Sequence, residues 1–319
     1  MKDKNERKKK TVAAVSPYLY PHNINFKEAA FKAWQQNGGQ IRNSHYPKKI
    51  LRGAVFRWEL PCSYKNKTEA RLRFVEPVSI KFDTFPDYAF YEVIPFIWDC
   101  WPIFFEDTCR YFIKHKVRTA FFTSSQSAER MKKRFPAMKI FFIPEGIDTT
   151  LYQGGKLLKD RNIDLLEFGR KNDKVVKYNL PDKINHLYSK KGEKLFATNK
   201  DLFSALADTR ITIALTRKDT QPELAEDIDT LTQRYWESML SRIVMVGRAP
   251  QELIDLIGYN PVIKLDQIHP SEQIIDILNN IEKYQSLVDK NRETALRLGD
   301  WKIRMRQVMN ELTRLGYNI

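Results

Sequence analysis

The feature that most constrains the fold is a regular alternation of short apolar runs with segments of helical spacing. The apolar run TAFFT at 119–123, for example, is followed by a helical pattern at 127–134 and by a second apolar run, KIFFI, at 139–143. Such alternation is typical of parallel α/β units. It occurs in two successive series, one before residue 150 and one from about residue 160. The sequence therefore predicts an α/β fold with two Rossmann-like domains, which we expect to face each other across a cleft.

Each series predicts its own strands and helices. In the first we expect strands at residues 11–16, 78–82, 88–94, 119–123 and 139–143, and helices at 26–36 and 127–134. Residues 40–75 are basic and show no clear periodicity. In the second we expect strands at 163–168, 211–215, 243–246 and 261–265, and helices at 201–207, 231–240, 252–257, 271–298 and 302–315. Ligands of such sheets bind at the carboxyl ends of the strands.

The two series divide the chain into four segments. We expect a basic tail at residues 1–10, a first domain at 11–150, a second domain at 151–300 and a C-terminal helix at 301–319. The last segment offers apolar surface beyond the second domain through Trp301, Ile303, Met305 and Met309. We therefore expect this helix to return towards the first domain.

The positive charge of the chain is concentrated in its first half. The 319 residues carry a formal net charge of +15. Residues 1–150 contain 27 Lys and Arg against 15 Asp and Glu, whereas residues 151–319 contain 27 against 24. A basic domain attracts nucleic acid, an anionic bilayer surface or a phosphorylated substrate. A solvated basic surface with no ligand is the alternative.

Cysteine usage and the N-terminus indicate a cytoplasmic protein. Cys62, Cys100 and Cys109 are odd in number and lack metal-ligand spacing, which is typical of free thiols in a reducing compartment. The first ten residues, MKDKNERKKK, have no apolar segment of the kind that a signal peptide needs.

The most apolar stretch, residues 88–105, is the one candidate for a membrane span. It contains Glu92, Asp99, Pro95 and Pro102. An acid at a bilayer centre costs roughly 3 kcal/mol on insertion scales, and prolines interrupt a helix. We therefore expect a buried strand followed by an aromatic-lined loop.

The strongest candidate site lies in the second domain, where Asp229 and Glu237 stand eight residues apart around the start of a predicted helix. Thr230 or Thr232 is suited to cap this helix. The unpaired N–H groups of a helix N-terminus suit a diphosphate, and an acid one or two turns further accepts hydrogen bonds from a ribose diol. A solvated helix face that carries two acids is the alternative.

This region resembles the retaining glycosyltransferases of group 1, or family 4, which have the GT-B architecture. The run LTQRYWESMLSRIVMVGRAPQEL at 231–253 is most similar to the compact bacterial branch, whose pattern is Thr-x-Arg-aromatic-Glu. In the family, two acids straddle the helix start and the second holds the nucleotide ribose. Glu237 matches the second acid, and Thr232 and Arg234 match the Thr and Arg. Asp229 matches the first acid, but as Asp rather than Glu and without the usual Gly-Phe-Gly.

Two further segments support the resemblance, which covers roughly residues 85–315. The segment FFIPEGIDTTLY at 141–152 is similar to the family's interdomain crossover. The segment DLLEFGRKNDK at 164–174 is similar to the first strand of its donor domain, where an Arg and a Lys contact the donor diphosphate. Arg170 matches the Arg. Lys174 matches the Lys, with Lys171 as the rival. An Arg at the end of a strand can grip phosphate oxygens with two hydrogen bonds.

The resemblance implies a retaining hexosyltransferase that uses a nucleoside-diphosphate sugar. The donor-binding residues it implies in the second domain are Arg170, Lys174, Thr232, Arg234 and Glu237, and the catalytic ones Arg170, Lys174 and Asp229. We expect neither a metal nor another cofactor, because these cations can neutralise the leaving diphosphate and no Asp-x-Asp pair stands out. The first domain would bind the acceptor, which is lipid-linked or a growing surface polysaccharide at the cytoplasmic face of an anionic membrane.

Two candidates in the first domain and two rival functions complete the predictions. Asp99 and His115 are candidates for the acceptor side, with a loop cap and a surface histidine as the alternatives. One rival function is another GT-B sugar-nucleotide enzyme, such as an epimerase. The other is a non-enzymatic nucleic-acid-binding protein, which requires basic residues interleaved with exposed aromatics. Here the basic residues are diffuse and the aromatics lie in apolar runs, so we expect no nucleic-acid partner.

Overall fold

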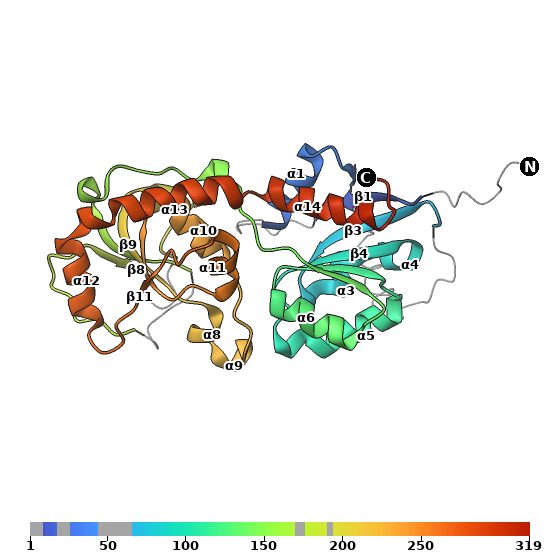
Figure 1. Cartoon of the computed structure of the whole chain (residues 1–319), viewed down its shortest axis with the longest axis horizontal. Helices are drawn as coiled ribbons and strands as arrows, with labels where there is room; N and C mark the ends of the chain where they lie inside the picture. The colour runs from blue at the N-terminus through green and yellow to red at the C-terminus, as the bar shows by residue number, and fades with distance from the viewer. Residues whose placement is uncertain (1–8, 18–25, 44–65, 170–175, 190–193) are drawn as a thin grey trace, which may run out of the picture. The chain divides into compact units, whose positions relative to one another are not determined.

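The computed structural model describes residues 9–17, 26–43, 66–169, 176–189 and 194–319. The chain divides into two compact units. Unit 1 comprises Met1–Pro144 together with Trp301–Ile319, and unit 2 comprises Glu145–Asp300. Each unit contains one parallel sheet with helices on its faces (Figure 1). The predicted α/β class with two parallel-sheet domains is therefore confirmed.

Unit 1 is built on a six-stranded sheet with the order β2-β1-β3-β4-β5-β6, in which every neighbouring pair is parallel. The strands are β1 (Thr11–Val15), β2 (Gln40–Arg42), β3 (Glu69–Val75), β4 (Glu92–Ile97), β5 (Thr119–Phe122) and β6 (Lys139–Phe142). Because all strands run the same way, their carboxyl ends share one edge of the sheet. Loops that follow the strands are therefore gathered at that edge.

Helices cover both faces of this sheet. One face carries α1 (Phe26–Gln36) and α14 (Trp301–Arg314), which lie side by side in Figure 1. Trp34 and Trp301 are fully buried in the core on this face. The other face carries η1 (Pro77–Ser79), α3 (Ile80–Thr84), α4 (Asp87–Phe90), α5 (Pro102–His115) and α6 (Ser125–Arg134). The chain's last helix is thus part of the first sheet's core.

Unit 2 is built on a five-stranded parallel sheet with the order β11-β10-β9-β7-β8. Its strands are β7 (Ile163–Glu167), β8 (His186–Tyr188), β9 (Thr209–Ala214), β10 (Val244–Gly247) and β11 (Ile263–Lys264). Its helices are η2 (Thr149–Leu151), η3 (Leu158–Asp160), α7 (Asn199–Ala207), α8 (Arg217–Thr220), α9 (Pro222–Ala225), α10 (Gln233–Leu240), α11 (Gln251–Ile257), α12 (Pro270–Asn279), η4 (Ile281–Tyr284) and α13 (Gln285–Leu298). Two separate apolar clusters pack on the two faces of the sheet.

The third strand of unit 1 lies where the sequence showed no clear pattern. A strand was expected at residues 78–82, and that expectation is wrong, because η1 and α3 occupy this stretch. The strand is β3, in which Arg71 and Arg73 alternate with apolar residues. Both arginines are buried, and ion pairs to Glu69 (2.8 Å) and Asp87 (3.2 Å) neutralise them. These partners offset the desolvation of the arginines, so the strand tolerates two charges on one face.

The apolar stretch at 88–105 begins in α4, so the strand expected at 88–94 starts only at Glu92, and a helix follows that strand. The strand, β4, is confirmed, but the expected aromatic-lined loop is wrong because α5 begins at Pro102. Proline is favoured at the first helical position, where its missing N–H costs nothing. In the part of the chain that the structure describes, no helix is long and apolar enough to cross a bilayer. The single helix expected at 271–298 is also interrupted, since α12 ends at Asn279 and η4 precedes α13.

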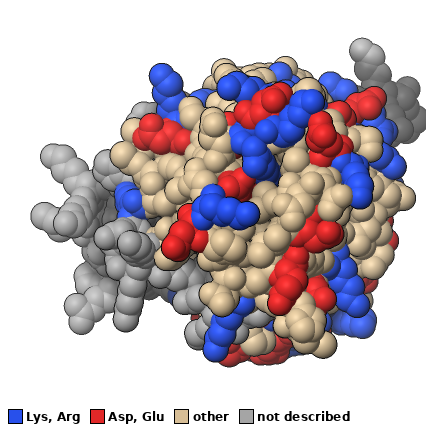
Figure 2. All heavy atoms as spheres, turned by 90° about the vertical axis from the view of Figure 1, so that its left-hand side faces the viewer, with Lys and Arg blue, Asp and Glu red and all other residues tan. Residues whose placement is uncertain are grey.

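The two units differ strongly in net charge. Unit 1 contains 31 Lys and Arg against 14 Asp and Glu, and unit 2 contains 23 against 25. On the face of unit 2 shown in Figure 2, Lys and Arg side chains lie interspersed with Asp and Glu side chains. The basicity of the chain therefore belongs to unit 1.

Candidate functional site

The candidate site lies at the carboxyl edge of the sheet in unit 2. There β7 continues into Gly169, β9 continues into Thr216, and β10 ends at Gly247 next to Arg248. A Cβ on Gly247 would lie 2.0 Å from the carbonyl oxygen of Ala214, so only glycine allows the chain to pass so close to β9. The loops after these strands are thereby brought together, and ligands of open parallel sheets bind at this edge.

Arg234 reaches this edge from α10. The backbone of Gly169 has φ +77°, and a Cβ there would lie 2.6 Å from Nη2 of Arg234. The guanidinium carbon lies 5.6 Å from the centre of the Phe168 ring. Arg234 is buried, and burial lowers the pKa of its guanidinium. A desolvated cation therefore lies against the backbone at the end of β7, immediately before Arg170 in the chain.

Glu237 follows Arg234 by three residues, so it lies about one turn further along the same helix. Its carboxylate is buried, with Oε1 accepting a hydrogen bond from the Tyr152 hydroxyl at 3.0 Å. Burial raises the pKa of Glu237, while the Tyr152 hydrogen bond and the charge of Arg234 oppose that change. All residues from Arg234 to Leu240 are buried, so the alternative of a solvated helix face is wrong.

The loop that leads into α10 is fixed by a glutamate of α11. Thr232 occupies the cap position in an extended conformation, and its side chain makes no capping hydrogen bond. The Thr230 hydroxyl instead donates to Glu252 at 2.8 Å, and the same carboxylate accepts from the Leu231 N–H at 2.9 Å. Glu252 thus anchors the loop before the helix, and the Thr232 hydroxyl is not used for capping.

Asp229 is held by an arginine that the sequence reasoning missed. Arg248 donates to both carboxylate oxygens of Asp229, from Nη1 at 2.5 Å and from Nη2 at 3.0 Å. It also donates to Asp219 and to the Thr216 hydroxyl. The hydrogen bond to Asp229 contributes most to raising the pKa of Arg248. Asp229 is therefore one side of a three-residue charge network at the carboxyl edge. The signal for Arg248 was present in the sequence, since Gly247-Arg248 repeats the Gly169-Arg170 pattern after a strand.

The two predicted diphosphate contacts cannot be placed. Arg170 and Lys174, as well as the rival Lys171, lie outside the described residues. Their assignments stay predictions. The structure does place Gly169, the chain neighbour of Arg170, at the end of β7 and against Arg234.

Asp99 and His115, the two acceptor-side candidates, are not brought together. Asp99 is exposed and follows the carboxyl end of β4 with φ +48°. His115 is the last residue of α5, about 20 Å further along that helix at its usual rise. The His115 ring lies 4.4 Å from the Tyr88 ring and 4.5 Å from the Tyr111 ring. Asp99 alone is therefore at the edge where ligands of such sheets bind.

No metal centre is apparent in the described part of the chain. Among its His, Cys, Asp and Glu residues, no group of three or more is arranged to hold an ion. Cys100 and Cys109 are free thiols, and burial raises the pKa of each, to about 12 and about 11. Both thiols are thus protonated at neutral pH.

No family model and no curated protein matches this sequence. Solved structures do match it. Sucrose-phosphate synthase from Thermosynechococcus elongatus aligns with a TM-score of 0.57 at 10% identity, over 96% of this chain and 99% of that one. The Anabaena protein HepE in complex with UDP-glucose aligns with a TM-score of 0.56 at 12% identity, over 95% and 99%. The chain has the GT-B fold. AviGT4, a glycosyltransferase of avilamycin A biosynthesis, gives a TM-score of 0.52 at 12% identity, over 96% of this GT-B chain and 97% of its own.

Proposed function

We propose that this chain is a glycosyltransferase that moves a hexosyl group from a nucleoside-diphosphate sugar to an acceptor. The observation that carries the proposal is the placement of Arg234 and Glu237. Both are buried on α10, and Arg234 lies against Gly169 at the carboxyl end of β7. The structure of HepE, which shares the fold, contains UDP-glucose. A buried cation and a buried carboxylate at this edge suit a diphosphate and a ribose, respectively.

The donor would be held by side chains from two segments of unit 2. Arg170 and Lys174 would bind the diphosphate after β7, and Arg234 would approach it from α10. Glu237 would accept hydrogen bonds from the ribose hydroxyls, with Tyr152 orienting its carboxylate. The Thr232 hydroxyl, which caps nothing, would add a contact at the start of the helix.

The reaction would proceed with retention at the anomeric carbon. Negative charge builds on the leaving diphosphate in the transition state, and fixed cations stabilise it without reorganisation. Arg170, Lys174 and Arg234 would supply this charge, so we expect transfer without added metal. Asp229 would act as a fixed partner of Arg248 near the transferred sugar rather than as a free base. Activity that is unchanged by a chelator supports this assignment, and strict dependence on Mg²⁺ contradicts it.

The acceptor would be bound by unit 1 and is lipid-linked or a growing surface polysaccharide. Asp99 is positioned for it, because it is exposed at the carboxyl edge of the sheet in unit 1. The positive charge of unit 1 suits an acceptor that carries phosphate or lies at an anionic surface. We therefore propose a cytoplasmic enzyme that is peripheral to a membrane.

Thermal unfolding in a panel of UDP, GDP, ADP and a single-stranded oligonucleotide tests the proposal. One nucleoside diphosphate should raise the melting temperature, because a ligand that binds only the folded state stabilises it. The Glu237→Ala variant should lose that shift. Stabilisation by the oligonucleotide alone would instead support nucleic-acid binding. Conversion of a nucleotide sugar into its epimer without an acceptor would support the rival sugar-nucleotide enzyme.

A further inference from the structure

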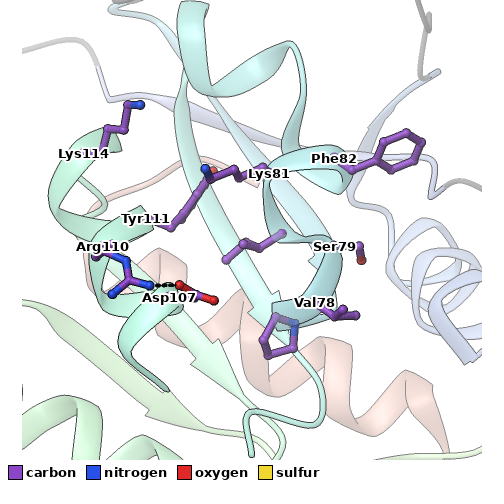
Figure 3. A pocket seen from close by; sticks show the side chains of 10 residues that line it. Val78, Ser79, Lys81, Phe82, Asp107, Arg110, Tyr111 and Lys114 are labelled. Carbon is purple, nitrogen blue, oxygen red and sulfur yellow. Dashed lines mark hydrogen bonds and ion pairs between the residues drawn. The ribbon is translucent and has the colours of Figure 1, made fainter. Parts of the chain in front are cut away.

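Unit 1 contains a groove between two elements of the face that carries α5. Figure 3 shows its walls, with η1 and α3 on one side and α5 on the other. The volume of the groove is about 410 Å³. Pro77 and Val78 line it from η1, Lys81 from α3, and Arg110, Tyr111 and Lys114 from α5. We call it the docking groove below.

Basic side chains predominate along the docking groove. Lys81, Arg110 and Lys114 are exposed and line it together with a single acid, Asp107, which pairs with Arg110. Arg110 and Lys114 are four residues apart and share one face of α5. Lys114 and Lys81 each lie in the last turn of their helix, where the helix dipole favours a cation, but that reason does not apply to Arg110. The helix dipole therefore does not explain why Arg110 joins the two lysines here.

Exposed aliphatic side chains flank these basic residues. Val78 is 69% exposed at the groove, and Ile113, next to Lys114 on α5, is 59% exposed. A single exposed aliphatic residue is ordinary in a soluble protein. Aliphatic side chains beside a basic cluster form the pattern of surfaces that lie in a bilayer interface, where apolar groups enter the acyl boundary and cations meet lipid phosphates.

We propose that the docking groove is where unit 1 binds an anionic phospholipid bilayer. Lys81, Arg110 and Lys114 bind headgroup phosphates, while Val78 and Ile113 enter the acyl boundary. This proposal rests on the proposed function, in which the acceptor is lipid-linked. Binding the bilayer would hold the enzyme at the membrane that contains this acceptor.

Charge complementarity favours a bilayer as the occupant, because unit 1 has 17 more basic than acidic residues. A nucleic acid would need exposed aromatic side chains on which its bases stack, whereas the two aromatic residues that line the groove, Phe82 and Tyr111, are half-buried and buried.

Sedimentation with vesicles tests the groove directly. The protein is mixed with vesicles of phosphatidylcholine alone or with added phosphatidylglycerol, at low and high salt. The wild type should bind the anionic vesicles much more tightly than the neutral ones, and less tightly at high salt. The Lys81→Ala/Arg110→Ala/Lys114→Ala variant should bind them roughly 100-fold more weakly, because each basic residue near an anionic surface contributes about fivefold. A variant that binds as tightly as the wild type overturns the proposal.

A matched variant separates the groove from general basicity. Lys132, Lys133 and Arg134 at the end of α6 are also exposed, and replacing all three with Ala removes the same charge from unit 1. This variant should keep most of the vesicle binding. Equal losses in the two triple variants would show that diffuse charge alone attracts the bilayer, and the groove would be rejected.

The aliphatic residues and the donor provide two further readouts. Val78→Ser/Ile113→Ser should abolish the part of the binding that survives high salt, because that part comes from apolar insertion rather than from screened charge. Unchanged binding at high salt overturns that half of the proposal. All variants should keep the thermal shift with nucleoside diphosphate, which shows that they fold. A variant that loses vesicle binding but keeps the thermal shift supports the groove as the bilayer contact. Absence of the thermal shift in the wild type contradicts the proposed function instead.

Discussion

Unit 1 and unit 2 are built on the same plan but use charge in opposite ways. Unit 2 is almost balanced, with 23 basic against 25 acidic residues, and its site charges are paired or buried. Arg248 is bound to Asp219 and Asp229, and Arg234 is buried on α10. Unit 1 has 31 basic residues against 14, and several of them stay exposed at the docking groove. One sheet architecture thus supports recognition by a few desolvated groups in one unit and by accumulated surface charge in the other.

This contrast has a consequence for salt dependence. Exposed charges are screened over about 8–10 Å at physiological ionic strength, whereas buried charges are screened much less. Binding of a nucleoside diphosphate by the buried groups of unit 2 should therefore weaken little with salt. Binding of anionic vesicles by unit 1 should weaken strongly. If nucleotide binding and vesicle binding depended equally on salt, the charges of unit 2 would be screened by solvent as those of unit 1 are. The proposed difference between the units would then be wrong.

The largest expected effect concerns the donor site of unit 2. Replacing Glu237 or Arg170 with Ala should reduce the rate of sugar transfer by about 2–4 kcal/mol of transition-state stabilisation, or roughly 30- to 1,000-fold. Glu237→Ala removes the carboxylate that accepts hydrogen bonds from the ribose hydroxyls, and Arg170→Ala removes a cation that binds the diphosphate. Transfer of radiolabelled sugar, measured beside circular dichroism, gives the result.

Vesicle binding provides the control for these two variants. Both should sediment with anionic vesicles as the wild type does, because neither residue belongs to unit 1. Full transfer activity in both variants would refute the site assignment. If a variant loses both vesicle binding and sugar transfer, then donor binding and bilayer binding are not divided between unit 2 and unit 1.

Most of the strands that could be predicted from the sequence contain a short run that is mainly apolar. Residues 119–123, 139–143 and 243–246 are such runs, and they form β5, β6 and β10. In β3, by contrast, Arg71 and Arg73 conceal the strand, because the partners that neutralise them are visible only in the folded chain. The three-residue edge strands β2 and β8 were also missed, since so short a segment carries no periodicity.

The candidate site divides in the same way. Arg234 and Glu237 were predicted because the segment that contains them matches a short sequence pattern of the family that it resembles. Tyr152 was not predicted, because its partner Glu237 is 85 residues further along the chain. Arg248 was overlooked because its role depends on two acids that other segments supply, Asp219 from α8 and Asp229 from the loop before α10. Local patterns therefore find the groups of one element, and only the fold shows what holds them.

A smaller effect is expected from the Tyr152 hydroxyl, which donates a hydrogen bond to Glu237. Tyr152→Phe removes the donor to a buried carboxylate, which should destabilise unit 2 by about 1–3 kcal/mol and weaken nucleotide binding. Tyr178→Phe is a matched control, since its hydroxyl is buried in the same unit with no hydrogen-bond partner among the described residues. Thermal unfolding and nucleotide titration should respond to the first variant and not to the second. Equal behaviour of the two would mean that Tyr152 does not orient Glu237.

The smallest expected effect is on the pH dependence of stability, through two buried glutamates, Glu92 in unit 1 and Glu237 in unit 2. Burial alone would raise the pKa of Glu92, but hydrogen bonds from Lys10 (2.5 Å) and Tyr317 (2.7 Å) outweigh it and lower that pKa. Burial raises the pKa of Glu237, which has no ion pair within 4.0 Å among the described residues. The ordinary value for both is 4.5. Ionisation therefore stabilises unit 1 through Glu92 and destabilises unit 2 through Glu237.

Because the two pKa shifts have opposite directions, the Gln variants of Glu92 and Glu237 should change stability with pH in opposite ways. The Glu92 contribution is present above pH 4.5 and is lost as the pH falls through its lowered pKa, so Glu92→Gln should cost about 1 kcal/mol at neutral pH and almost nothing once the pH has fallen below that pKa. The stabilisation from protonated Glu237 is present below 4.5 and is lost as the pH rises through its raised pKa. Glu237→Gln should therefore match or exceed the wild type at neutral pH, with the difference vanishing in acid. Calorimetric unfolding of both variants across this range tests the pair. Profiles of the same sign would show that the two units do not differ in how they hold a buried charge.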